Sequence, residues 1–549
     1  MNLQSLGRLA VLASACALVA GAACAEPDVS HVEAVNKTSA LPAGWNKHAA
    51  FMEIFVRSYK DSDGDGIGDF KGLTSQLDYL QGLGITGIWL MPIMPSEDHD
   101  HGYAVDDYRA IEPDYGTMAD FETFIAEAHK RGIGVILDFV CNHSGSGNAI
   151  FRDAAASKAS PYRDWYVFSD RNPGWYDAKR RGQDGRFWND PWKPVAKTVP
   201  DGQGYYYGVF SDQMPDWNLK NPRVVQYLQD TMRFWMNKGV DGFRLDAVTM
   251  LLEDGPRNYF NNPGNPVIVK QLKATVDEYD NRYMICEVSE GADKYLDACN
   301  AFAYGVQQST IDGAKKGMIE DGLIQQLQNP RADQEPLALQ SHDSYVGDRL
   351  IDQFGVNGTD SYRVAAAISI LASATPFSYY GEEIGMSNGG AYNDPGLRSP
   401  MSWTGETHTG GFTVATPYRN LAINVASNNV AAEAGDPSSL LEYYRALYTV
   451  RQAYPVLGTG RLRLQSKAGD AVLVFSRGDV PGQAAFVAVN VSASPQPLDV
   501  FTGMPATSFV NALHENGQPV TAAGSSDGDG HLKLTIAPKS AMVLVRDGS

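Results

Sequence analysis

The stretch Gly242-Phe243-Arg244-Leu245-Asp246-Ala247-Val248 decides how this chain is organised. It continues an apolar run from Val240, which predicts a short buried strand. Arg244 and Asp246 lie two residues apart at the carboxyl end of that strand, so both side chains share one face. A charged pair in this position costs desolvation free energy unless it is matched. Taken alone, the stretch fits a structural ion pair as well as it fits a functional site.

Short apolar strands and amphipathic helices alternate along most of the chain. Helices with apolar residues at three- and four-residue spacing follow the strands, for example over residues 70–83. Alternation of this kind implies a parallel sheet, and about eight such units close into a (β/α)8 TIM barrel, so the predicted fold class is α/β. The predicted strands are 51–56, 85–91, 133–140, 240–245, 283–288, 301–306, one starting at 337, and 377–380.

Two segments depart from this alternation. Residues 142–218 follow the third strand and are rich in aromatic residues, Gly, Pro and Asp, so we predict a small inserted domain there. Residues 457–549 alternate apolar and polar side chains between Gly-rich turns, which predicts a C-terminal antiparallel β-sandwich domain. The barrel then comprises residues 46–141 and 219–456.

The N-terminus has the features of a cleaved signal peptide over residues 1–25. Arg8 precedes an apolar run, and Ala23-Cys24-Ala25 fits a small-x-small cleavage site. The apolar run is too short to predict a transmembrane segment. We therefore expect a secreted or periplasmic protein in which residues 26–45 form a loose tether. Attachment of a lipid at Cys24 is the alternative.

The net charge limits the classes of binding partner, and the cysteine count limits the number of disulfides. The formal net charge of −19 disfavours nucleic acids and anionic membranes, which require a basic surface, and is compatible with a neutral substrate. Cys141, Cys286 and Cys299 remain once the signal peptide is removed, so at most one disulfide forms and the pairing stays open. We expect a monomer.

Acidic residues and histidines gather at the predicted strand ends. A single acidic strand end is an ordinary surface feature. Because the carboxyl ends of barrel strands meet at one face, the whole set predicts an active site. Its members are Asp138, Asn142 and His143 after the third strand, Arg244 and Asp246 on the fourth, Glu287 on the fifth, His342 and Asp343 on the seventh, and Glu382 and Glu383 after the eighth.

Seven stretches, in this order, resemble motifs of the α-amylase family of glycoside hydrolases, family 13. They are Gly87-Ile88-Trp89-Leu90-Met91-Pro92, Asp138-Phe139-Val140-Cys141-Asn142-His143, Met214-Pro215-Asp216-Trp217-Asn218, the stretch 242–248, the strand end at Glu287, His342-Asp343, and Gly381-Glu382-Glu383-Ile384-Gly385-Met386. The resemblance runs from about Phe51 into the final β domain. It implies a retaining enzyme that acts on α-glucosidic bonds.

The resemblance also implies a role for each motif residue. Asp246 would be the nucleophile, Glu287 the general acid/base and Asp343 the stabiliser of the transition state. Arg244 would orient Asp246 and lower its pKa, while Tyr103, His143 and His342 would hold the sugar at the cleaved bond. A retaining glycosidase needs one ionised carboxylate and one protonated carboxyl about 5 Å apart, which explains these residue types.

Departures from the family pattern bear on substrate preference. Ser341 replaces the usual Asn before His342, and Cys286 replaces the Gly that often precedes the catalytic Glu. The first interpretation is an α-amylase acting on starch and maltooligosaccharides, with preference for α-1,4 bonds because Ala247 beside the nucleophile is small. An exo-acting α-glucosidase or oligoglucosidase, or a transglycosylase such as a trehalose synthase, is the alternative favoured by Arg398-Ser399-Pro400-Met401-Ser402-Trp403. A catalytically inactive glycan-binding relative is the third interpretation.

A second acidic motif, Asp61-Ser62-Asp63-Gly64-Asp65-Gly66-Ile67-Gly68-Asp69, matches the start of a calcium loop. Its carboxylates repel one another unless a cation lies between them, although an ordinary acidic turn is the alternative. The predicted ligands are Asp61, Asp63, Asp65, Ile67 and Asp69, and the family resemblance implies the same ion. Whether a second calcium binds at Asn142 and Asp216 stays open.

Overall fold

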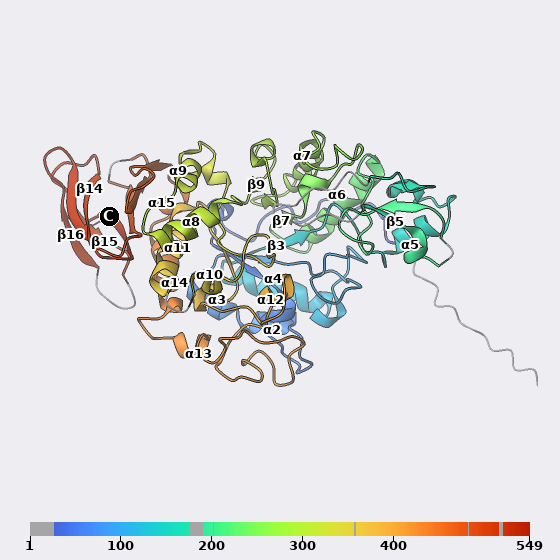
Figure 1. Cartoon of the computed structure of the whole chain (residues 1–549), viewed down its shortest axis with the longest axis horizontal. Coiled ribbons are helices and arrows are strands. Elements are labelled where there is room, and N and C mark those ends of the chain that lie inside the picture. Colours follow the sequence, from blue (N-terminus) through green and yellow to red (C-terminus); the bar gives the residue numbers. More distant parts are fainter. Residues whose placement is uncertain are drawn as a thin grey trace, which may run out of the picture.

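The computed structural model describes residues 27–175, 190–200, 202–355, 358–480, 482–514 and 520–548 (Figure 1). The predicted signal peptide and Cys24 lie outside the described residues. Within the described part of the chain, no helix combines the length and apolar character that crossing a bilayer requires.

A parallel sheet of seven strands forms the centre of the molecule, in the order β10-β1-β2-β3-β7-β8-β9. Each strand overlaps a predicted one, although the strand at Asn300–Ala301 shares only Ala301 with the predicted strand 301–306. Every residue of the longer strands is buried, as expected for a parallel sheet covered on both faces. The strands are β1 (Phe51–Ile54), β2 (Gly87–Leu90), β3 (Gly134–Phe139), β7 (Gly242–Leu245), β8 (Tyr283–Cys286), β9 (Asn300–Ala301) and β10 (Phe377–Tyr379).

The strand predicted to begin at Leu337 is extended chain without a strand ladder. Its backbone groups are satisfied elsewhere, because the Leu337 N–H donates to Ser373 Oγ (3.0 Å) and the Pro336 carbonyl accepts from the Ala303 N–H (3.1 Å). Ala338 nevertheless packs into the apolar interior of the barrel. The segment thus occupies the place between β9 and β10 where the seventh strand was expected.

Alternate residues of each strand divide the apolar side chains between two cores. Phe51 points into the barrel, where its ring stacks on Phe377 at 4.6 Å, whereas Met52 and Ile54 face the surrounding helices. Glu53 shares the inward face with Phe51 and is 2 % exposed. The inward faces therefore fill the barrel with rings, while Glu53, Asp138 and Arg244 place buried charged groups near the carboxyl ends of the strands.

Helices cover the outside of the sheet (Figure 1). The predicted helix over 70–83 is two helices that meet at Gln76, and α4 starts at a capping box between Thr117 and Asp120, with its predicted apolar face buried. The longer helices are α4 (Met118–Lys130), α6 (Pro222–Asn237), α7 (Asn265–Val276), α8 (Val306–Lys316), α11 (Thr359–Ala372) and α14 (Leu440–Ala453). The shorter ones are α1 (Val56–Tyr59), α2 (Phe70–Ser75), α3 (Leu77–Leu83), α9 (Asp321–Gln328), α10 (Leu350–Phe354), α12 (Asp394–Leu397), α13 (Val430–Glu433) and α15 (Val456–Thr459).

The segment after β3 forms a separate small unit, as predicted. It contains α5 (Ala149–Ala156) and an antiparallel sheet in the order β4 (Phe168–Ser169), β6 (Tyr205–Tyr207) and β5 (Trp192–Pro194). Its two ends return to one place, because His143 forms a β-bridge with Asp216 and Tyr166 forms one with Trp217. The Tyr166 and Trp217 rings stack at 4.6 Å. The insert is thus fixed directly beside the carboxyl end of β3.

The C-terminal β domain lies at the opposite end of the molecule from the insert (Figure 1). Every strand pairing in it is antiparallel, as predicted, with one sheet in the order β11-β12-β13-β18-β15-β16 and a second formed by β14 and β17. The strands are β11 (Leu462–Leu464), β12 (Val472–Arg477), β13 (Ala485–Asn490), β14 (Gln496–Phe501), β15 (Ser508–Asn511), β16 (Thr521–Ser525), β17 (His531–Ile536) and β18 (Ser540–Arg546).

The segment expected to be a loose tether is held against the barrel from residue 27 onward. Asn237 at the end of α6 accepts the Val35 N–H (2.9 Å) and donates to the Glu33 carbonyl (2.9 Å). Arg109 donates to the Ser30 carbonyl (3.0 Å), and Trp45 is 5 % exposed beneath the barrel. These long-range contacts were absent from the local sequence signal, which shows only a polar segment.

Candidate active site

Arg244 is the centre of a buried carboxyl cluster at the carboxyl ends of β3, β7 and β8. Its guanidinium donates to Asp246 (2.6 Å) and Asp138 (3.0 Å) and lies 3.1 Å from Glu287. The Arg244 side chain is 1 % exposed. The charged pair suggested by the sequence is thus one cation shared by three carboxyls. A structural strand cap would require only one of them.

His342 supplies a second cation beside this cluster. Its two ring nitrogens pair with Glu53 and with Asp343 (3.1 Å), and burial opposes the charge on the ring. The neighbouring carboxylates outweigh burial and raise the pKa of His342 to about 10. The Tyr103 hydroxyl lies 2.8 Å from His342 Nε2 and donates to Asp138 (2.8 Å). Tyr103 therefore links the two cations through one hydrogen-bond network.

The site contains more carboxyl groups than nearby cations, and their protonation differs from the sequence-based expectation. Burial raises the pKa of Asp246, and the charges of Glu287 and Asp138 add to this rise against the effect of Arg244. Arg244 lowers this pKa, as expected, but burial and the two neighbouring carboxyls outweigh its effect. Burial also raises the pKa of Asp138 to about 6. Although burial opposes it, His342 and Arg398 hold the pKa of Asp343 well below its usual range.

Burial and the repulsion between neighbouring carboxylates favour retention of a proton in a cluster of this kind. A proton held by the cluster matters for the chemistry, because a retaining glycosidase requires one protonated carboxyl among its acidic groups.

Glu287 is held by groups from three parts of the chain. One carboxyl oxygen accepts the Ala247 N–H (2.9 Å) and the other accepts the Tyr345 hydroxyl (2.5 Å). Ala247 can present its N–H in this way because its backbone is left-handed, with φ of 49°. Cys286, directly before Glu287, forms a disulfide with Cys299. This settles the pairing left open by the sequence, and Cys141 is the free, buried cysteine.

His143 lies next to this network as a neutral ring. Burial lowers its pKa to about 3, and its Nε2 atom is buried without a hydrogen-bond partner among the described residues. The Tyr103 and His342 rings, whose roles were predicted together with that of His143, stack at 5.5 Å. A buried ring nitrogen without a partner is suited to bind a hydroxyl group of a ligand.

The structure thus joins Asp246, Glu287, Asp343, Arg244, His342 and Tyr103 in one network and places His143 beside it. Sequence reasoning missed two participants, Glu53 and Tyr345. A signal for Glu53 was present, since a carboxylate inside the apolar strand Phe51–Ile54 requires a buried partner. No sequence signal pointed to Tyr345, whose contact with Glu287 spans 58 residues.

Two arginines from the segment after β10 form the rim of the site beside Asp343. Arg398 donates to Asp343 (3.3 Å) and to the His342 carbonyl (3.2 Å). Arg419 pairs with Asp100 at 2.6 Å, which joins this segment to the loop that carries Tyr103. The Asp100–Arg419 ion pair therefore bridges loops that are more than 300 residues apart in the sequence.

The predicted calcium loop lies between β1 and α2, apart from this network. Carboxylate oxygens of Asp61, Asp63 and Asp65 come within 4.8 Å of one another. Burial raises the pKa of Asp65, and the charges of Asp63 and Asp61 contribute to the rise. Asp69 lies outside this group of three, because its carboxylate caps α2 through the Gly72 N–H (2.8 Å) and accepts from Ser62.

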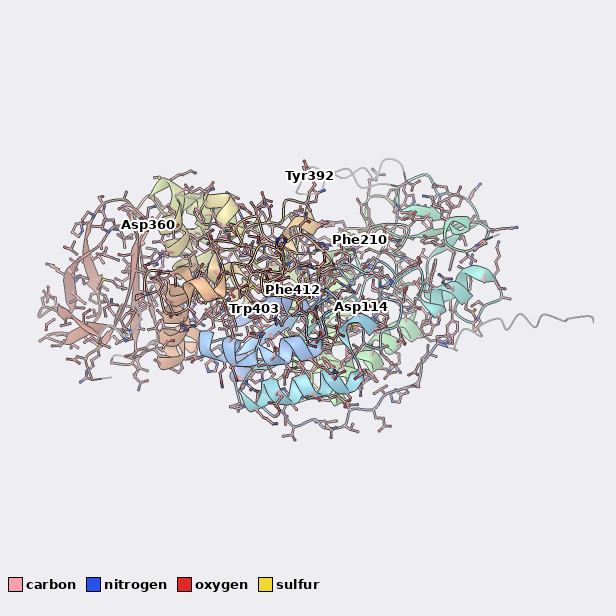
Figure 2. The ribbon with its side chains drawn as sticks, turned by 90° about the horizontal axis from the view of Figure 1, so that it is seen from below. Asp114, Phe210, Asp360, Tyr392, Trp403 and Phe412 are labelled. Carbon is pink, nitrogen blue, oxygen red and sulfur yellow. A yellow bond between two sulfur atoms is a disulfide. The ribbon has the colours of Figure 1, made fainter. Side chains whose placement is uncertain are left out.

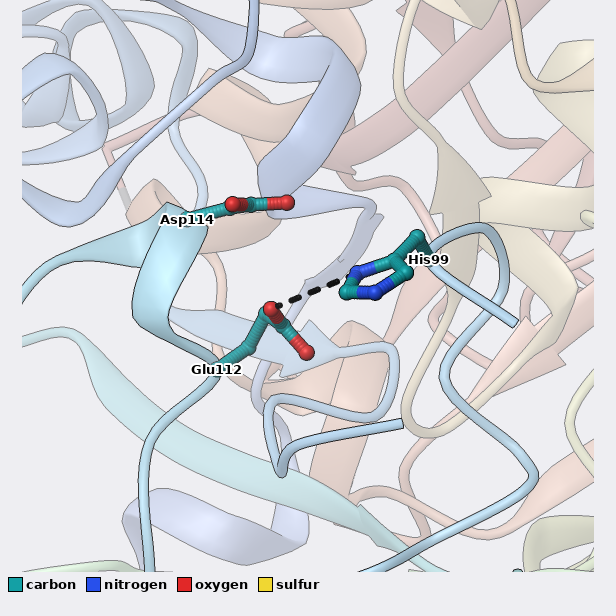
Figure 3. A group of neighbouring side chains, drawn as sticks. All are labelled: His99, Glu112 and Asp114. Carbon is teal, nitrogen blue, oxygen red and sulfur yellow. Dashed lines mark ion pairs between the residues drawn. The ribbon is translucent and has the colours of Figure 1, made fainter. Parts of the chain in front are cut away.

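Two other polar groups bear on metal binding. His99, Glu112 and Asp114 form a further cluster near the same loop (Figure 3), but Arg57 already pairs with Asp114 at 2.8 Å and the Ser96 N–H donates to Glu112. At the insert, Asn142 donates to Asp216 (3.1 Å), and burial raises the pKa of Asp216 well above its ordinary value. Asn142 and Asp216, for which a second calcium site stayed open, therefore form a hydrogen bond with each other.

Comparison with known proteins agrees with this geometry. Residues 53–460 match the family described as alpha amylase, catalytic domain, and residues 464–547 match alpha amylase, C-terminal all-beta domain. The chain thus belongs to the α-amylase family, glycoside hydrolase family 13, whose members include hydrolases and transglycosylases of α-glucosides.

The similar proteins differ in their named activities. Alpha-amylase 3 of Dictyoglomus thermophilum is 34% identical over 78% of this chain and 82% of its own. Trehalose synthase/amylase TreS of Mycolicibacterium smegmatis is 30% identical over 84% and 87%, and an oligo-1,6-glucosidase of Halalkalibacterium halodurans is 30% identical over 81% and 90%. Among solved structures, trehalulose synthase MutB of Pseudomonas mesoacidophila MX-45 superimposes with a TM-score of 0.76 at 26% identity, covering 92% of this chain and all of its own.

Proposed function

We propose that the protein is an α-amylase that hydrolyses α-1,4-glucosidic bonds in starch and maltooligosaccharides with retention of configuration. The observation that carries the proposal is the shared Arg244 contact, which sets the carboxyls of Asp246 and Glu287 beside each other. Retaining glycosidases use two such carboxyls on opposite sides of the cleaved bond.

In the first step, the Asp246 carboxylate attacks the anomeric carbon while Glu287 gives its proton to the leaving glycosidic oxygen. The bond from the anomeric carbon to the leaving oxygen breaks, and a covalent ester with Asp246 forms. In the second step, Glu287 takes a proton from water, the water oxygen attacks the anomeric carbon, and Asp246 leaves. Asp343, which His342 and Arg398 keep ionised, stabilises the positive charge that develops on the sugar in both steps.

The proposed α-1,4 preference rests on Ala247. This residue follows the nucleophile, is 7 % exposed and has a left-handed backbone that β-branched residues adopt poorly. Its single methyl group leaves space on the leaving-group side. A methyl-scale change in such a pocket is worth roughly 1–3 kcal/mol. We therefore expect a higher kcat/KM for maltotriose than for isomaltotriose, and the opposite order would contradict the linkage assignment.

Exo action, with or without transglycosylation, is the second candidate. The Asp100–Arg419 ion pair favours it, because a bridge across the rim beside Asp343 restricts how far a chain can extend past the cleaved bond. The relatives named trehalose synthase and oligo-1,6-glucosidase also support this candidate.

Product analysis separates the two candidates. An α-amylase should lower the viscosity and iodine staining of starch well before much reducing sugar appears, and nuclear magnetic resonance should detect the α anomer first. An exo-acting enzyme should release glucose from maltose while iodine staining persists, and a trehalose synthase should convert maltose to trehalose. Arg419→Ala tests the rim directly, since removal of the bridge should raise the ratio of starch to maltose activity if the ion pair limits chain length.

We also propose that Ca²⁺ binds the loop at Asp61, Asp63 and Asp65, with the Ile67 carbonyl and Asp69 completing the predicted set. The residues fit the ion, because three carboxylates converge and none of them forms an ion pair with a Lys, Arg or His in the described part of the chain. The ion would supply the missing positive charge and stabilise the fold. It has no proposed part in the chemistry.

Export from the cytoplasm is a further part of the proposal. The Cys286–Cys299 disulfide supports it, since such bonds persist mainly in oxidising compartments. N-terminal sequencing of the protein from the periplasmic or extracellular fraction should start at Glu26, whereas retention of Met1 would contradict it.

A further inference from the structure

The Tyr345 hydroxyl makes a short hydrogen bond to the proposed acid/base. It donates to Glu287 Oε1 at 2.5 Å, a distance typical of a hydroxyl bound to a carboxylate. Burial and the Glu287 charge raise the pKa of Tyr345 well above its ordinary value, so the phenol stays protonated at neutral pH. The Tyr304 ring meets the Tyr345 ring edge-on at 5.6 Å and fixes its position.

The two oxygens of Glu287 have partners of different kinds. Oε2 contacts the Ala247 N–H and the Arg244 guanidinium, which only donate hydrogen bonds. A proton on that oxygen would oppose both donors. Oε1 contacts a hydroxyl, which can accept as well as donate. The acidic proton therefore belongs on Oε1, next to Tyr345.

One tight turn places Tyr345 and Asp343 together. The Val346 N–H donates to the Asp343 carbonyl (3.1 Å), and Gln307 on α8 donates to the Val346 carbonyl (3.3 Å). The turn therefore directs a carboxylate and a phenol into the same site, and α8 holds it in place. Tyr345 is thus a fixed part of the site, where its hydroxyl donates to Glu287.

We propose that Tyr345 is a positioning residue that makes proton transfer by Glu287 efficient, an inference that rests on the proposed acid/base role of Glu287. While Glu287 is protonated, the Tyr345 oxygen accepts from Oε1 and orients the carboxyl group. As the proton passes to the leaving glycosidic oxygen and the sugar–oxygen bond breaks, the Tyr345 hydroxyl turns to donate to the new carboxylate. The same contact holds Glu287 when it later takes a proton from water.

The test is the dependence of rate on the leaving group in Tyr345→Phe, measured with aryl α-glucosides from 2,4-dinitrophenyl to phenyl and with maltotriose. Loss of a hydrogen bond to a charged group should lower kcat/KM about 10- to 100-fold for phenyl glucoside and maltotriose. The 2,4-dinitrophenyl substrate leaves without protonation, so its kcat/KM should change less than about 3-fold. An equal loss for all leaving groups would overturn the inference.

Tyr79→Phe is the matched control. The Tyr79 hydroxyl donates to Glu383 (2.7 Å), a strand-end carboxyl for which the described part of the chain shows no hydrogen bond to Arg244, Glu287 or Asp343. The substitution therefore removes the same kind of hydrogen bond away from that network. It should leave the leaving-group dependence as in the parent. If Tyr345→Phe does not fold by circular dichroism, Tyr345→Gln and Tyr345→Met carry the same comparison, since only glutamine can donate. Steeper leaving-group dependence for Met than for Gln supports the inference, and equal dependence contradicts it.

Glu287→Gln separates failure of this inference from failure of the proposed function. If Glu287 is the acid, this variant loses activity steeply toward poor leaving groups. A uniform loss in Glu287→Gln would show that the acid/base assignment is wrong. A steep dependence in Glu287→Gln with a uniform loss in Tyr345→Phe would show that only the role of Tyr345 is wrong.

Discussion

Two acidic clusters in the same barrel differ in how the repulsion between their carboxylates is balanced. The catalytic cluster has its own cations, since Arg244 touches three carboxyls and His342 pairs with Glu53 and Asp343. The loop at residues 61–69 brings three carboxylates together without an ion pair to a basic residue in the described chain. The first cluster thus has protein cations of its own, and the second is the one for which we propose a bound Ca²⁺.

The two clusters differ in charge balance because one lies at buried strand ends and the other lies in a partly exposed loop. The residues proposed as catalytic lie at the carboxyl ends of buried strands, where uncompensated charge is most costly and neighbouring strands place partners at fixed register. In the loop, Asp63 and Asp65 are exposed, so water lowers the cost of leaving the charges without a protein cation. Figure 2 labels Asp114, which belongs to the cluster of His99, Glu112 and Asp114 near this loop.

Removal of the nucleophile should have the largest effect on the catalytic cluster. We expect Asp246→Asn to lower kcat on maltotriose by about 10⁴-fold or more, because an amide cannot form the glycosyl ester. The circular dichroism spectrum should match that of the parent, since the side chain keeps its size. Starch hydrolysis at a near-parent rate would refute the nucleophile assignment.

Removal of the shared cation should cost stability as well as activity. Arg244→Met leaves Asp138, Asp246 and Glu287 without their cation in a buried site, and breaking such a pair typically costs about 3–5 kcal/mol. The free energy of unfolding from urea titrations measures this loss. The loss should be smaller at acidic pH, where carboxyls are neutral. A loss below about 1 kcal/mol at neutral pH would mean that the cluster does not depend on Arg244.

Calcium removal should affect the loop and leave the catalytic cluster intact. With calcium at 100–1,000 times its dissociation constant, chelation should cost about 2.7–4.1 kcal/mol and lower Tm. Asp63→Asn is the control, since the weakened loop should respond less to the chelator. Activity well below Tm should be retained. An unchanged melting curve, with no calcium found by metal analysis, would identify the loop as an ordinary turn.

The pH dependence of stability should report the contribution of His342. Its pKa is raised in the folded protein from 6.5 to about 10, despite burial, by Asp343 and Glu53. The stabilisation should therefore be fully present below pH 6.5 and be lost as the pH rises toward 10. The difference in unfolding free energy between the parent and His342→Gln should shrink across this range. A difference that stays constant from pH 6.5 to 10 would show that the ring is not charged in the folded protein.

The successes and failures of sequence-based prediction have a common cause. Strand positions were predicted because apolar runs of strand length are a local signal, and strand-end residues follow because a barrel places them on one face. The strand expected at Leu337 was wrong as a paired strand, because Ser373 takes its N–H. Arg244 lowers the pKa of Asp246 as expected, but burial and two neighbouring carboxyls, which the motif alone does not show, outweigh that effect.

The barrel, its two additional β-rich units and the identity of the carboxyl groups could all be predicted from the sequence, because they follow from local periodicity and from motifs a few residues long. The contacts between these groups could be identified only from the tertiary structure. The Tyr345–Glu287 hydrogen bond, the Glu53–His342 pair and the Cys286–Cys299 disulfide join residues from different units of the barrel or from opposite ends of a loop. Such contacts depend on how the strands are arranged around the barrel, which no short stretch of sequence records.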